Sequence, residues 1–204
     1  MAGTGTSGEP PSRWVTAERW AAGVKDNGMG EAVRIYYTRY FPALALLLLA
    51  LGTGGSYLLW RGQVSWLEHL RIGVLLMATG CMIGGLVYNA KRLKPRVDLG
   101  TADAMIALNR ADHASVRRQI TGKEPADLEH LTVVRAAAVQ VRKQTATNLL
   151  ITPSFLSLLS TTDQWWFMAI GGTLLLTTLF LTVREFRRQG RFLQETENLA
   201  EQNP

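Results

Sequence analysis

PALALLLLALGTGGSYLLW, residues 42–60, is a run of 19 residues without a charged side chain. At about 1.5 Å of rise per residue, an α-helix of this length reaches roughly 28 Å, close to the ~30 Å thickness of the hydrocarbon core of a bilayer. The run therefore predicts a membrane-spanning helix over Pro42–Trp60. A helix of a soluble protein rarely stays apolar on every face over so many residues.

Three more apolar stretches follow along the chain. Ile72–Tyr88 and Trp165–Val183 contain no Asp, Glu, Lys, Arg or His, residues that are costly at membrane depth. Ala146–Thr162 is less apolar, because it is rich in serine and threonine and contains Pro153. Hydroxyl groups can bond to carbonyls of their own helix, and a proline is tolerated where a neighbouring helix satisfies the freed carbonyl. We predict a kinked span here, with a re-entrant or interfacial segment as the alternative.

Basic residues lie on alternate sides of these stretches. Of the 22 Lys and Arg residues, five precede the first stretch, eleven lie between the second and the third, and four follow the last. Only Arg61 and Arg71 lie between the first two. Loops rich in Lys and Arg stay in the cytoplasm. The distribution therefore predicts four crossings with both termini cytoplasmic, because three crossings would place Arg184–Arg191 outside.

The predicted fold is an all-α membrane protein with four transmembrane helices and a short helical cytoplasmic insertion between the second and third. Its parts are an N-terminal cytoplasmic tail (1–41), a first hairpin (42–88), the insertion (89–145), a second hairpin (146–183) and a C-terminal cytoplasmic tail (184–204). Aromatic residues at the span ends are interpreted as interfacial anchors; those before the first span are Tyr36, Tyr37, Tyr40 and Phe41.

The segment before the first span divides into a tail and a short helix. Residues 1–11, rich in Gly, Thr, Ser and Pro, are predicted to be disordered. From Ser12 an amphipathic helix is predicted, ended by Asp26–Gly30; its apolar residues are Trp14, Ala17, Ala21 and Val24. Two interpretations stay open, a helix on the membrane surface and a frayed tail.

The insertion is predicted to form three helices. The first runs over Thr101–Asn109, the second is capped by Asp112 and ends near Ile120, and the third begins at Pro125 and can continue into the third span. Their apolar stripes are too narrow for an independent core. They must pack on each other, on the bundle or on a partner, so a docking surface for another protein and a self-packed cytoplasmic cap both stay open.

Small residues at packing spacing recur inside the predicted spans, including a GxxxG pattern at Gly80–Gly84. Packing within the monomer is the preferred interpretation, with a homodimer as the alternative. The candidate helix-packing residues are Ala50, Gly54, Gly73, Gly80, Gly84, Gly171 and Gly172.

The sequence offers no candidate catalytic, cofactor-binding or metal site, and we predict that the protein is not an enzyme. His69, His113 and His130 are scattered, without ligands at metal-binding spacing, and are interpreted as surface residues, with His69 in a solvated loop beside Arg71. A polar path through the membrane is considered at Thr152, Ser154 and Ser157. The net charge of +6 is attributed to anionic lipid at the cytoplasmic face rather than to nucleic acid.

The run Ile106–Ile120, together with 17 Arg against five Lys, resembles small uncharacterised multi-pass membrane proteins of actinobacteria. The resemblance implies a bacterial inner membrane and transfers no activity. The preferred function is a non-catalytic accessory, scaffold or regulatory component of a membrane complex. The alternatives are a small transporter or channel subunit and a sensor of lipid or membrane stress.

Overall fold

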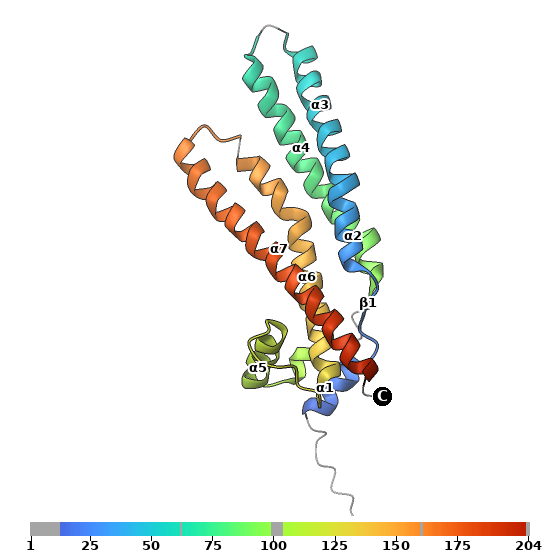
Figure 1. Ribbon diagram of the computed structural model, residues 1–204. Coiled ribbons are helices and arrows are strands. Elements are labelled where there is room, and N and C mark those ends of the chain that lie inside the picture. Colours follow the sequence, from blue (N-terminus) through green and yellow to red (C-terminus); the bar gives the residue numbers. More distant parts are fainter. Residues whose placement is uncertain (1–12, 62, 99–103, 160, 203–204) are drawn as a thin grey trace, which may run out of the picture.

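The computed structural model describes residues 13–61, 63–98, 104–159 and 161–202, and these form helices joined by turns and irregular segments, with one short β-ladder (Figure 1). In chain order the elements are α1 (Arg13–Ala21), β1 (Lys25–Asp26), α2 (Met29–Ile35), η1 (Tyr36–Tyr40), α3 (Phe41–Leu59), α4 (Trp66–Tyr88), η2 (Asn89–Leu93), η3 (Lys94–Arg96), β2 (Val97–Asp98), η4 (Ala104–Ala107), α5 (Arg110–Ile120), α6 (Leu131–Leu159) and α7 (Trp165–Gln202). The predicted disorder of residues 1–11 lies outside the described residues.

Three helical runs are long and apolar enough to cross a membrane: Met29–Leu59, Trp66–Arg96 and Met168–Asn198, each of 31 residues. The all-α membrane architecture is thereby confirmed in outline. The stretch Ala146–Thr162 belongs to α6 as far as Leu159, and α6 is not among these runs because its serines, threonines and preceding cations lower its hydropathy. Within the three runs only 6% to 22% of the most apolar window is buried in the protein. The exposed apolar side chains of these helices therefore need an apolar surrounding.

The long helices form two hairpins, α3 with α4 and α6 with α7 (Figure 1). The hairpins touch through α4 and α6, and they diverge toward their tips, where α3/α4 extends further than α6/α7. Close approach of α3 and α4 depends on Gly52 and Gly73, since a Cβ on Gly52 would lie 2.7 Å from the Gly73 Cα. At the shorter tip, Arg71 of α4 pairs with Asp163 of the α6–α7 connection.

The opposite end of the molecule carries a packed assembly that we call the cap, comprising residues 13–30, 97–98, 104–145 and 186–198. In it α1, η4 and α5 pack on the first half of α6 beside the end of α7 (Figure 1). The β-ladder joins β1 to β2 in antiparallel register, Lys25 opposite Asp98. Buried apolar residues of the cap include Ala17, Met29, Val116, Val133, Val134, Phe192 and Leu193.

The cap corrects the expectation for the N-terminal helix. The apolar face of α1 is covered by α6 and η4, with Ala17 fully buried and Ala21 3% exposed. The Trp14 ring stacks on His130 with 3.9 Å between ring centroids. This helix is therefore neither a membrane-surface helix nor a frayed tail, because its stripe is used against the protein itself.

Helix starts in the insertion also differ from the prediction. The described part of Thr101–Asn109 holds only the short 3₁₀ turn η4. Asn109, not Asp112, caps α5, since its Oδ1 accepts the Asp112 N–H bond at 2.9 Å. The last helix begins at Leu131 rather than Pro125, and it continues unbroken to Leu159 as expected.

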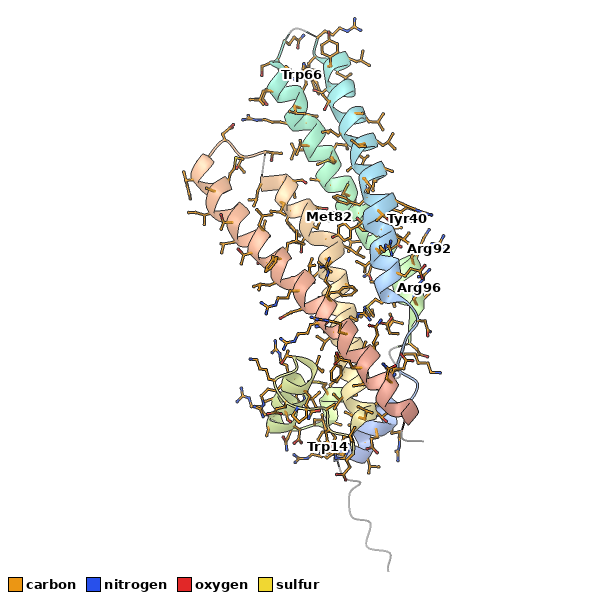
Figure 2. The ribbon with its side chains drawn as sticks, viewed as in Figure 1. Trp14, Tyr40, Trp66, Met82, Arg92 and Arg96 are labelled. Atoms are coloured by element: carbon orange, nitrogen blue, oxygen red, sulfur yellow. The ribbon has the colours of Figure 1, made fainter. Side chains whose placement is uncertain are left out.

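The residues predicted to anchor the first span at the membrane interface form an internal aromatic cluster. Tyr36 is 1% exposed, and its ring packs 5.0 Å from that of Tyr88, centroid to centroid. Tyr37 donates a hydrogen bond to the Leu149 carbonyl, and Tyr88 donates one to the Ala32 carbonyl at 2.8 Å. Only Tyr40 stays exposed on the outer side (Figure 2). These rings join the start of the first long helical run to α4 and to α6.

Candidate functional site

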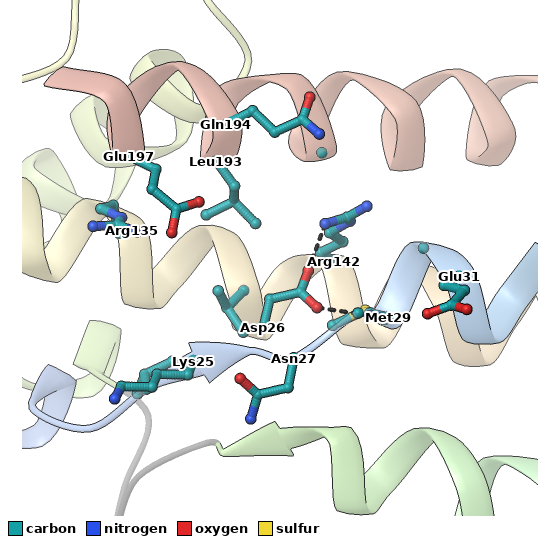
Figure 3. Close-up of a pocket in the computed structure, with 15 residues that line it drawn as sticks. Lys25, Asp26, Asn27, Met29, Glu31, Arg135, Arg142, Leu193, Gln194 and Glu197 are labelled. Atoms are coloured by element: carbon teal, nitrogen blue, oxygen red, sulfur yellow. Dashed lines mark hydrogen bonds and ion pairs between the residues drawn. The ribbon is translucent and has the colours of Figure 1, made fainter. Parts of the chain in front are cut away.

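A cavity of ≈ 570 Å³ with many polar lining residues lies in the cap (Figure 3). Its walls come from the segment between α1 and α2, from α6 and from the end of α7. Three cationic and three carboxylate side chains line it, namely Lys25, Arg142 and Arg135, and Asp26, Glu31 and Glu197.

Asp26 and Arg142 form the central contact of this cavity. The Arg142 Nη1 donates to Asp26 Oδ2 at 2.5 Å, and the two side chains are only 15% and 12% exposed. The other oxygen, Oδ1, accepts the Met29 N–H bond at 2.8 Å. Gly28, with φ of 91°, turns the chain between them into the left-handed region that favours glycine. The Asp26 carboxylate thus accepts hydrogen bonds both from the first residue of α2 and from Arg142 of α6.

The Arg142 guanidinium passes between two glycines and over an aromatic ring. A Cβ on Gly190 would lie 2.7 Å from Arg142 Nη2, and one on Gly30 would lie 3.0 Å from it. The guanidinium carbon lies 4.7 Å from the centre of the Phe186 ring, within the range of a cation–π contact. Arg142 therefore ties α6 to α7 and to the start of α2. Its buried Nε has no hydrogen-bond partner in the part of the chain that the structure describes.

Other charges of the cavity are less constrained. Glu31 lies 3.7 Å from Arg96 in an exposed pair, while Arg135 makes no ion pair with any described residue. Among the described residues no three His, Cys, Asp or Glu side chains gather closely enough to hold a metal ion. The lining offers guanidinium, ammonium, carboxylate and amide groups, which suit the binding of a polar or charged segment.

Sequence reasoning missed both partners of the central contact, because Asp26 was assigned to a helix break and Arg142 was counted only among the basic flanks. One local signal was present. Gly190 lies in the segment REFRRQGRFLQE of α7, which is otherwise rich in strong helix formers, and glycine there costs about 1 kcal/mol relative to alanine. Such a glycine indicates that something approaches the backbone closely.

The candidate helix-packing residues divide into two groups in the structure. A Cβ on Gly73, Gly80, Gly84 or Gly171 would meet atoms of a neighbouring helix, Thr53, Leu48, Leu44 and Leu159 respectively. Gly54 and Gly172 have no such atom within 4 Å, and Ala50 is exposed. In α3 the close approach is made by Gly52, two residues before Gly54.

The candidate polar path is not assembled into one surface. Thr152 donates to the Asn148 carbonyl at 2.8 Å and Ser157 to the Pro153 carbonyl at 3.2 Å, so both satisfy their own helix. Ser154 is 1% exposed, and its Oγ has no hydrogen-bond partner among the described residues. At 100° per residue, Thr152 and Ser154 point about 160° apart around α6.

His69 is buried rather than solvated, which corrects its assignment to an open loop. It is 2% exposed, and its Nδ1 lies 2.8 Å from the Oγ of Ser56 on α3. His130 is not a free surface residue either, because it stacks on Trp14 and lies 3.3 Å from Glu18. His69 thus joins α4 to α3, and His130 joins the turn before α6 to α1.

No protein-family model, curated protein or solved structure matches this chain. The role of the site is therefore inferred from the geometry of the cap and of the long helices alone.

Proposed function

We propose that this protein is a non-catalytic, four-span protein of the bacterial inner membrane that serves as an accessory, scaffold or regulatory subunit of a membrane complex. The observation that carries this proposal is the cap itself. Segments from the N-terminus, the insertion and the C-terminal helix pack into one body, which is fastened to both hairpins and holds an open charged cavity.

The hydrogen bonding of α6 supports a fourth crossing. Pro153 has no N–H, so the Leu149 carbonyl lacks its partner within the helix. The Tyr37 hydroxyl donates to that carbonyl, as a membrane helix containing proline requires. Thr147 and Thr152 bond back to carbonyls of the same helix. The polar groups that lower the hydropathy of α6 are thus largely satisfied, and its antiparallel partner α7 is itself of membrane length.

The charge distribution supports a cytoplasmic cap. Twenty of the 22 Lys and Arg residues belong to segments on the cap side of the long helices. Figure 2 shows Arg92 and Arg96 where the α3/α4 hairpin meets the cap, and Trp66 at the far tip. Basic residues flanking spans stay in the cytoplasm. With four spans, both termini share that side.

Binding of a protein partner is the role that the cap suits best. The cavity holds cations and carboxylates together, and Arg135 has no ion-pair partner among the described residues. Charges of both signs favour specific polar partners, since like charges opposed across an interface are unfavourable. The partner segment in this proposal is polar and carries an acidic group that meets Arg135.

The test is purification of the full chain from its native membranes in a mild detergent. A partner in stoichiometric amount is expected with the unchanged protein and is lost with Arg135→Glu. Arg61→Glu is the matched control, because Arg61 is exposed at the opposite end of the first hairpin and should retain the partner. Absence of any stoichiometric partner, or equal loss in both variants, contradicts the scaffold role.

Topology is tested separately by thiol labelling of single cysteines placed at Gln63 and at Asn198 in a Cys81→Ala background. A membrane-impermeant reagent added to intact cells should label only the cysteine at position 63. Labelling of both positions from outside contradicts the four-span arrangement.

A transporter or channel subunit is the second candidate, favoured by the buried, unpartnered hydroxyl of Ser154 in α6. Flux through liposomes containing the purified protein would have to fall with Ser154→Ala and persist with Thr152→Ala. Equal flux in both variants excludes a path through this hydroxyl.

A further inference from the structure

A second hollow adjoins the first, with which it shares Arg142, Gly190 and Gln194, and it lies in the groove between α6 and α7. It has a volume of ≈ 560 Å³ and is lined by Arg142, Phe186, Arg187, Gly190, Arg191 and Gln194. In contrast to the larger cavity, it contains three guanidinium groups and no carboxylate. Its chemistry is that of an anion site, because fixed guanidinium groups bind phosphate and carboxylate groups strongly.

The three arginines are available to different degrees. Arg187 and Arg191 are exposed, lie one turn apart on α7 and make no ion pair with any described residue. Arg142 is the least available of the three, because it is only 15% exposed and is neutralised in part by Asp26, and its Nε is buried without a hydrogen-bond partner among the described residues. Figure 3 shows Arg142 rising from α6 toward α7 on the side of Gln194. Gly190 lets the guanidinium lie directly against the backbone of α7, since a Cβ there would lie 2.7 Å from Nη2.

The basic groove continues into an apolar stripe on the same helix. Leu176, Phe180, Arg187 and Arg191 fall within about 60° of one another around α7 at 100° per residue. The two apolar residues are 58% and 67% exposed. Arg187 lies four residues beyond Val183, or about 6 Å along the helix axis. One face of α7 therefore carries exposed apolar side chains followed along the helix by exposed guanidinium groups. Their spacing corresponds to that between the acyl chains and the phosphate of a lipid.

We propose that this groove binds the phosphate of an anionic phospholipid of the cytoplasmic leaflet, held by Arg142, Arg187 and Arg191. The acyl chains lie along Leu176 and Phe180. The proposal rests on the cytoplasmic orientation of the cap given under the proposed function. A soluble phosphate compound would find the same guanidinium groups but would leave the apolar stripe unused, which is why a lipid is the favoured source.

The test compares binding of phosphatidylglycerol and phosphatidylcholine to the purified full chain in detergent, by phosphorus retained per protein and by the shift in melting temperature. Phosphatidylglycerol is expected to bind at least about tenfold more tightly, because each basic residue near an anionic lipid surface contributes about 1 kcal/mol, or roughly fivefold. The double variant Arg187→Gln/Arg191→Gln should lose about tenfold or more of that affinity.

The matched control is Arg13→Gln/Arg19→Gln, which removes two exposed arginines from α1, at the far end of the cap in Figure 1. It should keep the preference for phosphatidylglycerol. Equal loss in both double variants indicates only general electrostatics and overturns the site. So does equal binding of the two lipids. If inorganic phosphate protects the lipid-free protein as well as phosphatidylglycerol does, the groove is a soluble-anion site and the lipid assignment is wrong.

Failure here is distinguishable from failure of the proposed function. The thiol-labelling experiment reports orientation without reference to lipid, and the unfolding transition of each arginine variant shows whether its fold is intact. If the cysteine at position 198 is protected from the external reagent and the protein shows no preference for phosphatidylglycerol, only the lipid site is rejected. If the cysteine at position 198 is labelled from outside, the orientation on which the site depends is rejected.

Discussion

Asp26→Asn removes the charge that faces Arg142 and keeps an oxygen that can accept the Met29 N–H bond. Because these two side chains are 12% and 15% exposed, water solvates the remaining guanidinium poorly. Two unit charges about 4 Å apart attract by roughly 4 kcal/mol at an effective dielectric constant of about 20, and removing one member of a buried pair costs about 3–5 kcal/mol. After a discount for the residual exposure, we expect the free energy of unfolding to fall by about 2–3 kcal/mol.

The assay is unfolding of the purified full chain in mixed micelles as the mole fraction of SDS rises. Tryptophan fluorescence follows the transition, and Trp14 reports on the cap because it stacks on His130. The matched control is Glu31→Gln, which removes a carboxylate that is 70% exposed and 3.7 Å from its guanidinium partner. An exposed pair of this kind contributes only about 0–1 kcal/mol.

A double-mutant cycle isolates the pair itself. In an Arg142→Met background, Asp26→Asn should cost less than about 1 kcal/mol, because the guanidinium that needed the charge is gone. Equal destabilisation by Asp26→Asn and Glu31→Gln would refute the reasoning. A cost of Asp26→Asn that is unchanged in the Arg142→Met background would also do so, since the charge would then act through something other than this contact.

Three further predictions use the same unfolding assay. Gly73→Ala should lower the free energy of unfolding by about 1–3 kcal/mol, since its methyl group collides with α3. Gly54→Ala should be neutral or stabilising by up to about 1 kcal/mol, because its surroundings are open. Equal effects of the two substitutions would contradict the packing of α3 on α4. Tyr37→Phe should cost about 1–2 kcal/mol by leaving a carbonyl unsatisfied, and clearly less in a Pro153→Ala background, where an N–H is restored to α6; an undiminished cost would show that the hydroxyl has another role. Burial and the nearby Lys94 lower the pKa of Lys143, so the folded state binds this proton less readily than the unfolded state, and the free energy of unfolding should rise with pH between the lowered pKa and 10.5. Lys143→Met should flatten that rise. A rise of unchanged slope in this variant would assign the pH dependence to other groups.

The long apolar helices were predictable because hydropathy is local and additive along the chain. Residues 42–60 and 72–88 need no partner to reveal their length and their lack of charge. The apolar half of α6 was harder, because its hydroxyl groups and Pro153 lower its hydropathy. The Leu149 carbonyl that Pro153 leaves free accepts a hydrogen bond from Tyr37, a residue distant in sequence. No local pattern encodes that bond.

The boundaries inside the insertion were missed for a related reason. Pro125 suits the first turn of a helix, yet the Asp127 N–H donates to Gln119 Oε1 at 3.0 Å, and the Glu129 N–H donates to Asp127 Oδ1 at 3.0 Å. These bonds satisfy the backbone outside a helix. They hold the segment against α5, so α6 begins only at Leu131.

The amino-acid sequence by itself determined which segments are apolar, how long they are and on which side their basic flanks lie, since these properties depend only on neighbouring residues. Tertiary structure alone decided that Asp26 meets Arg142, that α1 is part of a packed cap and that Gly52 rather than Gly54 faces α4. Each of these contacts joins segments far apart in the chain, and burial makes them specific, because an ion pair or a close helix approach forms only where the complete fold excludes water and leaves room.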